Sequence, residues 1–274
     1  MPPPKKPSAF AGYERATAAF TPRIIMLLTG EVGAGKTDFV LGAPGPIVIH
    51  TFDQGTEGVV EDYVARGKEI YLAQYNLGVE VGEEVTHAAV VELRDRFIAN
   101  FEADIARART IVIDRESDLW NYHVFAETGN DDKFAAAAAK DWPKIKAKLR
   151  RLTAMAKASK VNLIYTQGMK NTWSKTVNPK TGNSTSVPDG GRQPDGMDTV
   201  EADVHIVADM KRVDVADGPS RFYLHVGKSR GPGSRLVQGQ TFEVVKPNDD
   251  DVAEFGFKEL ASLIFSETES SDWE

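Results

Sequence analysis

A glycine-rich stretch, GEVGAGKT at Gly30–Thr37, has the residue types and the spacing that hold a phosphate group. Gly30 and Gly35 bracket four residues, and a lysine and a threonine follow at once, so the pattern G-x-x-x-x-G-K-[ST] is matched in full. Glycines let the backbone bend around a phosphate, and a following helix adds the positive end of its dipole. The pattern predicts a nucleotide site in which Lys36 reaches the β- and γ-phosphates and Thr37 binds Mg²⁺.

The predicted contacts with ATP extend over the whole loop and into the helix that follows it. Such a site also needs a carboxylate at the end of a neighbouring buried strand, which holds Mg²⁺ through its water shell. The segment TIVID ends in Asp114 and fits that role, and Glu116 and Asp118 lie close by as alternatives. The predicted metal ligands are therefore Thr37 and Asp114. The predicted ATP-binding residues are Gly30, Glu31, Val32, Gly33, Ala34, Gly35, Lys36, Thr37 and Asp38.

Hydrolysis of ATP also needs a group that orients or deprotonates water. Asp53 follows the apolar run IVIHTF, a strand that we expect next to the strand before the phosphate loop, and Glu57 comes four residues later. Either carboxylate is therefore a candidate, and Asp53 is preferred. Asp53 is equally compatible with the cap of a helix. Gln167 ends the apolar run NLIYTQ, where an amide can sense the γ-phosphate and pass its presence to the segment that follows.

Apolar runs separated by polar segments predict the strands that position these groups. Two periodic stretches predict helices, over about Gly82 to Arg107 and over Asp141–Ser159, with Asp141 as the N-cap. Apolar strands that alternate with helices favour a mostly parallel α/β sheet covered on both faces, with the later strands as an antiparallel extension at one edge. The predicted strands are Arg23–Leu28, Gly45–Phe52, Lys68–Asn76, Ala108–Asp114, Lys160–Gln167, Ala202–Arg212, Arg221–Arg230 and Gln240–Lys246.

The composition excludes several classes of protein. None of the 274 residues is cysteine, which removes disulfides, cysteine-ligated zinc and thiol nucleophiles. No apolar run is long enough to cross a bilayer, and the first residues lack a signal-peptide pattern, so we expect a cytoplasmic protein without membrane contact. The net charge of −7 conceals a net +10 over Lys140–Lys180, with eleven Lys and Arg against one Asp, and a net −8 over Asn248–Glu274, with nine acids against one Lys.

The basic run leads into a long polar segment, Asn171–Thr199, that suits a single-stranded nucleic acid. Binding such a strand needs cations that follow its backbone and aromatic platforms for its bases. We expect the segment to be a loop without fixed structure until a ligand orders it. The run also includes a helix face with Lys144, Lys148 and Arg151, which is equally compatible with plain solvent exposure. The predicted nucleic-acid contacts are Lys170, Trp173, Lys175, Lys180 and Arg192.

Taken together, these segments resemble the RecA-like recombinase ATPases over about Arg23 to Phe242. The resemblance is closest to the small core-only members from bacteriophages, the Sak-type single-strand annealing proteins. GEVGAGKT resembles the phosphate loop of the family, and TIVID its metal-carboxylate strand. NLIYTQGMK and the polar segment after it resemble the sensor glutamine and the second DNA-binding loop. YLHVGKSRGPGSR resembles a family strand that ends in two spaced basic residues.

The resemblance implies a domain layout and further site residues. Lys228 and Arg230 would act as fingers that reach the nucleotide of a neighbouring subunit. Residues 21–247 would form a RecA-like P-loop NTPase core. Residues 1–20 would form a mobile arm that docks on the next subunit, and residues 248–274 an acidic tail.

The activity implied by the resemblance is ATP-dependent binding of single-stranded DNA in phage-type homologous recombination or strand annealing, by a DNA-dependent ATPase in a bacterial host cytoplasm. The family usually has Glu at the end of its second strand, and the shorter Asp53 predicts slow hydrolysis. Implied partners are single-stranded DNA, further copies in a filament or ring, and a single-strand-binding or replication protein at the acidic tail. Alternatives are a ring-forming helicase or translocase, a nucleotide-dependent regulator or loader of a replication protein, and a small-molecule kinase.

Overall fold

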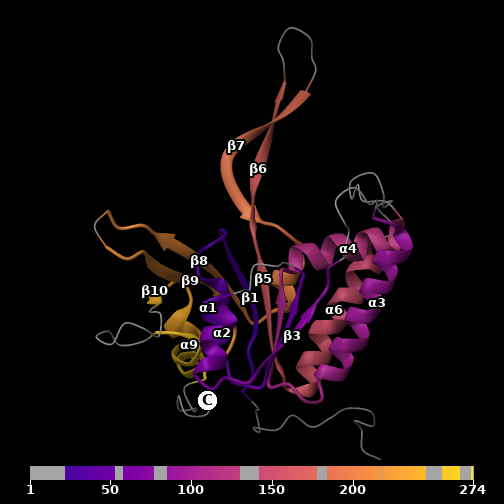
Figure 1. The fold of residues 1–274 in the computed structure, drawn as a ribbon. Coiled ribbons are helices and arrows are strands. Elements are labelled where there is room, and N and C mark those ends of the chain that lie inside the picture. The colour runs from indigo at the N-terminus through magenta and orange to yellow at the C-terminus, as the bar shows by residue number, and fades with distance from the viewer. Residues whose placement is uncertain are drawn as a thin grey trace, which may run out of the picture.

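The computed structural model places the apolar runs side by side in one eight-stranded sheet (Figure 1). It describes residues 22–52, 58–76, 85–129, 142–177, 184–216, 218–244, 255–265 and 273. The strands of the sheet are β1 (Ile25–Gly30), β2 (Ile47–Thr51), β3 (Ile70–Gln74), β4 (Thr110–Asp114), β5 (Asn162–Gln167), β8 (Ile206–Val213), β9 (Arg221–Ser229) and β10 (Thr241–Val244). From edge to edge their order is β10-β9-β8-β1-β5-β4-β2-β3.

The six neighbouring strands β3, β2, β4, β5, β1 and β8 pair in parallel. β9 and β10 continue the sheet beyond β8 in antiparallel fashion. β1 lies between β5 and β8, so that Thr29 stands opposite both Gln167 and Asp209. Strands β1 and β5 are buried over their whole length, as expected where helices cover both faces of a sheet. The predicted α/β class, a P-loop NTPase core with a mostly parallel sheet and an antiparallel extension at one edge, is confirmed.

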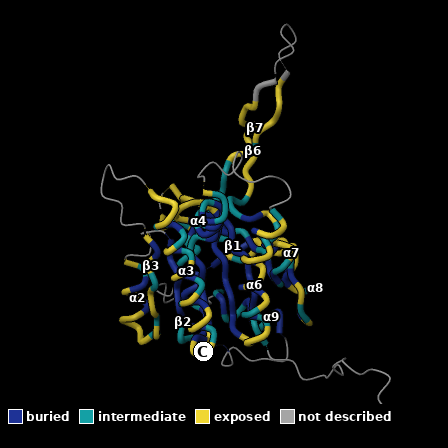
Figure 2. The backbone as a smooth tube through the Cα atoms, turned by 90° about the vertical axis from the view of Figure 1, so that its right-hand side faces the viewer, coloured by how far each residue is buried: buried dark blue, intermediate teal, exposed yellow. Residues whose placement is uncertain are grey.

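Helices cover both faces of the sheet and divide the core into two layers. The helices are α1 (Lys36–Leu41), α2 (Val59–Ala65), α3 (His87–Asp104), α4 (Glu116–Thr128), α6 (Trp142–Ser159), α7 (Val200–Asp203), α8 (Ser234–Val237) and α9 (Phe257–Ile264). One layer includes Phe39 of α1, Tyr63 of α2 and Phe257 of α9. The other includes Phe97 of α3 and Leu149 of α6. Figure 2 shows the strands as a buried centre between helices whose outer sides are exposed.

A two-stranded hairpin, β6 (Met169–Val177) and β7 (Ser184–Pro194), extends away from the sheet (Figure 1). The prediction of a loop without fixed structure in this segment was therefore wrong. The strands pair in antiparallel register, with one irregularity between Asn171 and Trp173. The sequence TWSKTV mixes β-branched and aromatic residues with small polar ones, and such residues suit a ribbon that is exposed to solvent.

Part of the segment expected to be an acidic tail belongs to the packed core. α9 buries Phe257 in the same layer as α1, and Trp273 stacks on Phe265 with ring centroids 5.6 Å apart. The arm at residues 1–20 lies outside the described residues, and so does the expected boundary at 247/248. The domain boundaries therefore stay predictions.

Candidate nucleotide-binding site

The predicted phosphate loop connects the end of β1 to the first turn of α1, as the motif requires. Three of its glycines have positive φ angles, 150° at Gly30, 76° at Gly33 and 85° at Gly35. A side chain at Gly30 would place its Cβ 2.5 Å from the carbonyl oxygen of Met210, and one at Gly35 would lie 3.0 Å from the ring of Phe222. Glycine at these positions therefore lets the backbone turn tightly enough to direct N–H groups at a phosphate.

Lys36 lies inside the loop that it is predicted to serve. Its Nζ donates hydrogen bonds to the carbonyl oxygens of Gly30, at 2.8 Å, and of Glu31, at 2.9 Å. Burial lowers the pKa of Lys36, and the negative charge of Asp114 opposes that shift. The ammonium group is thus held within the loop, where it can exchange backbone carbonyls for the more strongly bonding oxygens of a phosphate.

Asp114 ends β4 on the face of the sheet that α1 covers. Val112, two residues earlier, belongs to the core layer of α1, and alternate residues of a strand share a face. The Asp114 carboxylate accepts a hydrogen bond from the hydroxyl of Thr166, a buried residue of β5 that was not predicted to belong to the site. Thr37 and Asp114 offer the hydroxyl and carboxylate oxygens that suit Mg²⁺ alongside nucleotide phosphates, so the donor set fits the predicted metal.

The amide of Gln167 lies on the opposite face of the sheet. Tyr165, two residues earlier in β5, belongs to the core layer of α3, α4 and α6, and alternate residues of a strand share a face. The Nε2 of Gln167 donates to the carboxylate of Glu116 at 2.5 Å, and both side chains are almost completely buried. Glu116 begins α4, accepts a second bond from the backbone N–H of Met197 at 3.3 Å, and has its pKa raised to about 7 by burial. A contact between Gln167 and a γ-phosphate requires the amide to leave this partner.

The hairpin begins just beyond β5 and is fastened directly to the phosphate loop. Arg192 of β7 forms an ion pair with Glu31 at the tip of the loop, with Nη2 and Oε2 2.7 Å apart. The same guanidinium donates to the carbonyl oxygen of Met169 at 3.1 Å. At the base of the hairpin, Lys170 pairs with Asp195 at 3.1 Å. Lys170 and Arg192 therefore both have partners within the protein, and Glu31, the partner of Arg192, belongs to the phosphate loop.

A cavity of about 620 Å³ lies where the phosphate loop, the hairpin and the end of β8 meet. Glu31, Arg192 and Arg212 contribute charges to its lining. Arg212 was not predicted as a site residue, although its guanidinium lies 3.9 Å from where a Cβ of Gly33 would stand. The adjacent Lys and Arg that close the run ADVHIVADMKR are the signal that could have identified it.

The predicted aromatic contact and one predicted cation share a face of the hairpin. Trp173 stands opposite Pro188 and Lys175 opposite Ser186, and directly opposed residues of an antiparallel pair project to the same side. Trp173 is 60% exposed, and Lys175 is exposed as well. Two residues along a strand span about 7 Å, so the ribbon presents an aromatic platform and a cation at that spacing.

Lys228 and Arg230 lie at the other end of the sheet from the phosphate loop. Lys228 of β9 stands opposite Val207, near the start of β8, whereas Gly30 stands opposite Met210 further along that strand. The Lys228 ammonium donates to the backbone carbonyl of Glu201. The two predicted fingers are therefore remote from the nucleotide loop of their own chain, and only a second subunit would bring them to a nucleotide.

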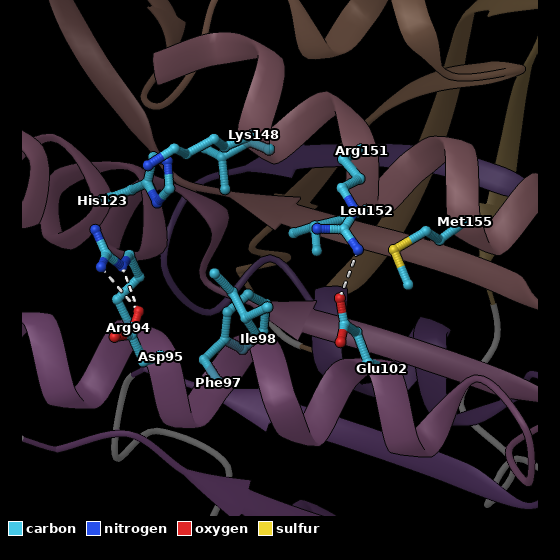
Figure 3. A pocket seen from close by; sticks show the side chains of 11 residues that line it. Arg94, Asp95, Phe97, Ile98, Glu102, His123, Lys148, Arg151, Leu152 and Met155 are labelled. Carbon is cyan, nitrogen blue, oxygen red and sulfur yellow. Dashed lines mark hydrogen bonds and ion pairs between the residues drawn. The ribbon is translucent and has the colours of Figure 1, made fainter. Parts of the chain in front are cut away.

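The basic face of α6 is occupied by carboxylates of neighbouring elements. Arg151 pairs with Glu102 of α3 at 2.9 Å, beside a pocket of about 210 Å³ between α3, α4 and α6 (Figure 3). Lys148 pairs with Glu127 of α4 at the same pocket. Two further cations of the helix have partners of the same kind: Lys146 with Asp198, and Arg150 with Asp203. The helix is therefore not a continuous cationic surface.

Three predicted site residues, Asp53, Glu57 and Lys180, lie outside the described residues. Their roles in water activation and nucleic-acid contact stay predictions. Within the described ranges, each helix is too short or too polar to traverse a bilayer.

The chain is similar in sequence to one known family, and one solved structure has a low overall similarity to it. The crystal structure of the flagellar accessory protein FlaH from Methanocaldococcus jannaschii is similar with a TM-score of 0.42 and 11% identity, over 82% of this chain and 87% of that chain. No curated protein matches the sequence. A family profile described as an AAA domain matches residues 23–234, which include the phosphate loop, Asp114 and Gln167. The chain belongs to this AAA-domain family, and its core is a P-loop NTPase domain.

Proposed function

We propose that the protein is an ATPase that binds single-stranded DNA in an ATP-dependent manner and acts in homologous recombination or strand annealing. The proposal follows the resemblance to the core-only Sak-type proteins of bacteriophages. Mg²⁺·ATP binds at Gly30–Thr37, and the DNA strand lies along the β6–β7 hairpin. Trp173 stacks on a base and Lys175 contacts the phosphate backbone, the combination that single-strand binding needs.

The observation that carries the proposal is the direct contact between the nucleotide loop and the hairpin. The ion pair of Glu31 with Arg192 joins the tip of the loop to β7 at 2.7 Å. Lys36 holds the carbonyl oxygen of the same Glu31 at 2.9 Å. A phosphate that draws Lys36 away from this carbonyl changes the loop at the residue that holds the hairpin, so nucleotide and DNA affect each other's binding.

Each residue of the loop region has a distinct task in this proposal. Lys36 and the backbone N–H groups bind the phosphates, and Thr37 and Asp114 hold Mg²⁺, which neutralises phosphate charge when bound. Thr166 keeps the Asp114 carboxylate in place through its hydrogen bond. Water activation falls to Asp53 or Glu57.

Self-association belongs to the proposal because Lys228 and Arg230 cannot serve their own nucleotide loop. In a filament or a ring, the start of β8 and the end of β9 of one copy would face the loop of the next copy. The acidic C-terminal residues outside α9 are the proposed contact for a single-strand-binding or replication protein.

ATP hydrolysis measured with and without single-stranded DNA tests the function. We expect slow basal hydrolysis that rises severalfold with DNA, and loss of both rates in Lys36→Ala. Lys144→Ala, which removes an exposed lysine of α6, serves as the matched control and should retain both rates. A wild-type rate that does not change with DNA would contradict the proposal.

A nucleotide-dependent regulator or loader of a replication protein is the second candidate. The ion pairs along α6 favour this candidate, because they reduce the number of cations that are available to bind DNA. This candidate predicts hydrolysis that responds to a protein partner and not to DNA, so the same measurement separates the two.

A further inference from the structure

Glu116 occupies the point where β5, α4 and the chain returning from the hairpin meet. Its carboxylate accepts one hydrogen bond from Nε2 of Gln167 at 2.5 Å and another from the backbone N–H of Met197 at 3.3 Å. Glu116 is 1% exposed and Gln167 is 2% exposed. One buried carboxylate therefore ties the predicted nucleotide sensor to the chain three residues beyond the end of β7.

Glu116 and Gln167 are tightly packed against Gly196. Gly196 lies against this pair so closely that an added Cβ would clash with both the Glu116 carboxylate and the Gln167 amide. The backbone of Gly196 has a φ of 150°, which favours glycine, and Met197 next to it is buried. The Glu116 carboxylate and the Gln167 amide are therefore both in close contact with the backbone at Gly196.

The pair also holds the amide away from the phosphate loop. The backbone of Gln167 stands opposite Thr29, immediately before the loop, but its side chain projects to the α4 face. Thr166, with the opposite orientation, contacts Asp114 on the α1 face. The backbone of Gln167 therefore lies beside the strand that leads into the loop, whereas its amide is bonded to a carboxylate on the other face of the sheet.

We propose that Glu116 is a positioning residue that restrains the Gln167 amide until a γ-phosphate competes for it, and that this competition loosens the base of the hairpin at Gly196 and Met197. The inference rests on the sensing role of Gln167 in the proposed function and gives that role a physical route. A phosphate oxygen is a charged acceptor, and charged acceptors form stronger hydrogen bonds than neutral ones, so a γ-phosphate can compete with the Glu116 carboxyl group for the amide. ADP, which has no γ-phosphate, should leave the pair intact.

The test compares binding of Mg²⁺·ATP and Mg²⁺·ADP to the full chain and to two variants. Glu116→Gln keeps the shape of the side chain but replaces the anionic acceptor with an amide. We expect its affinity for ATP to rise roughly fivefold, the scale of the difference between charged and neutral hydrogen bonds, with the ADP affinity unchanged. Glu127→Gln removes an ion-paired carboxylate from the same helix and should change neither affinity.

A second variant keeps the proposal falsifiable if Glu116→Gln does not fold. Gln167→Ala removes the donor, and we expect it to lose the preference for ATP over ADP that we expect of the wild type. In that background, Glu116→Gln should add nothing to ATP affinity. The proposal is overturned if Glu116→Gln shifts ATP and ADP affinity together or weakens ATP binding, or if Gln167→Ala keeps the wild-type preference.

A DNA measurement separates this inference from the proposed function. In Glu116→Gln, the ratio of single-stranded DNA affinities with and without ATP should fall toward one, because the hairpin base is already released. If the wild type binds no single-stranded DNA with any nucleotide, the proposed function fails. The comparison of ATP with ADP still decides the role of Glu116 in that case.

Discussion

The helix α6 and the strand β6 lie in one strongly basic run of the sequence, yet the cations of the helix and the cation in the middle of the hairpin have different surroundings. On α6, Arg151 and Lys148 pair with carboxylates of α3 and α4. On the hairpin, Lys175 is exposed and shares a face with the exposed ring of Trp173. Lys148 and Arg151 of α6 pair with carboxylates of neighbouring helices. Lys175, in the middle of the hairpin, faces solvent beside the aromatic ring of Trp173.

This difference shows why a charge count over-predicts a nucleic-acid surface. The carboxylate partners of Lys148 and Arg151 lie 21 and 49 residues away in the chain, so the pairing depends on the fold. An ion-paired cation must give up its partner before it can bind a phosphate. Lys170 and Arg192 at the base of the hairpin are ion-paired as well. In the proposed function, DNA contact therefore falls to Lys175 and Trp173 in the middle of the hairpin, and the ion-paired cations of α6 have a structural role.

Removal of the aromatic platform should have the largest effect on DNA binding. Trp173→Ala should weaken single-stranded DNA binding by roughly fivefold to a hundredfold, since stacking of a base on an aromatic ring is worth about 1–3 kcal/mol. Val187→Ala truncates an exposed residue on the other face of the same ribbon and is the matched control. Fluorescence anisotropy of a labelled oligonucleotide measures both, and equal losses in the two variants would count against a specific face.

Removal of single lysines should give a smaller effect that distinguishes the two regions. Lys175→Ala should reduce the slope of log affinity against log salt by about 0.7, the value for one phosphate contact on a single strand. Lys148→Ala, the same change on α6, should leave the slope unchanged because its ammonium is paired with Glu127. Salt titrations of both variants make the comparison, and a slope that falls as much for Lys148→Ala would remove the distinction between helix and hairpin.

The strands and the phosphate loop were predictable from the sequence because their signals are local. The apolar runs around β1, β4 and β5 became buried parallel strands, and the glycines of the loop adopt the φ angles that their spacing implied. The residues Lys36 and Asp114 are brought close enough for the carboxylate to influence the pKa of the ammonium. The motif alone indicated this part of the site. The expectation that the strand before Asp53 lies next to the strand before the loop was wrong, because β5 and β4 lie between β1 and β2.

The remaining features depend on contacts between distant parts of the chain. The bond between Gln167 and Glu116 joins residues 51 apart, and that between Arg192 and Glu31 joins residues 161 apart. The glycines, prolines and polar residues of the hairpin segment predict a loop, because they outnumber the β-branched positions of TWSKTV. Helix α4 was not predicted either, although its buried Leu119, Trp120 and Val124 have helical spacing.

The affinity for single-stranded DNA, measured with and without Mg²⁺·ATP over a range of salt concentrations, tests most directly the link between the nucleotide loop and the hairpin. We predict binding that tightens with ATP, weakens steeply with salt, and loses its dependence on ATP in Lys36→Ala. The same affinity with and without ATP in the wild type, or binding that does not respond to salt, would contradict it.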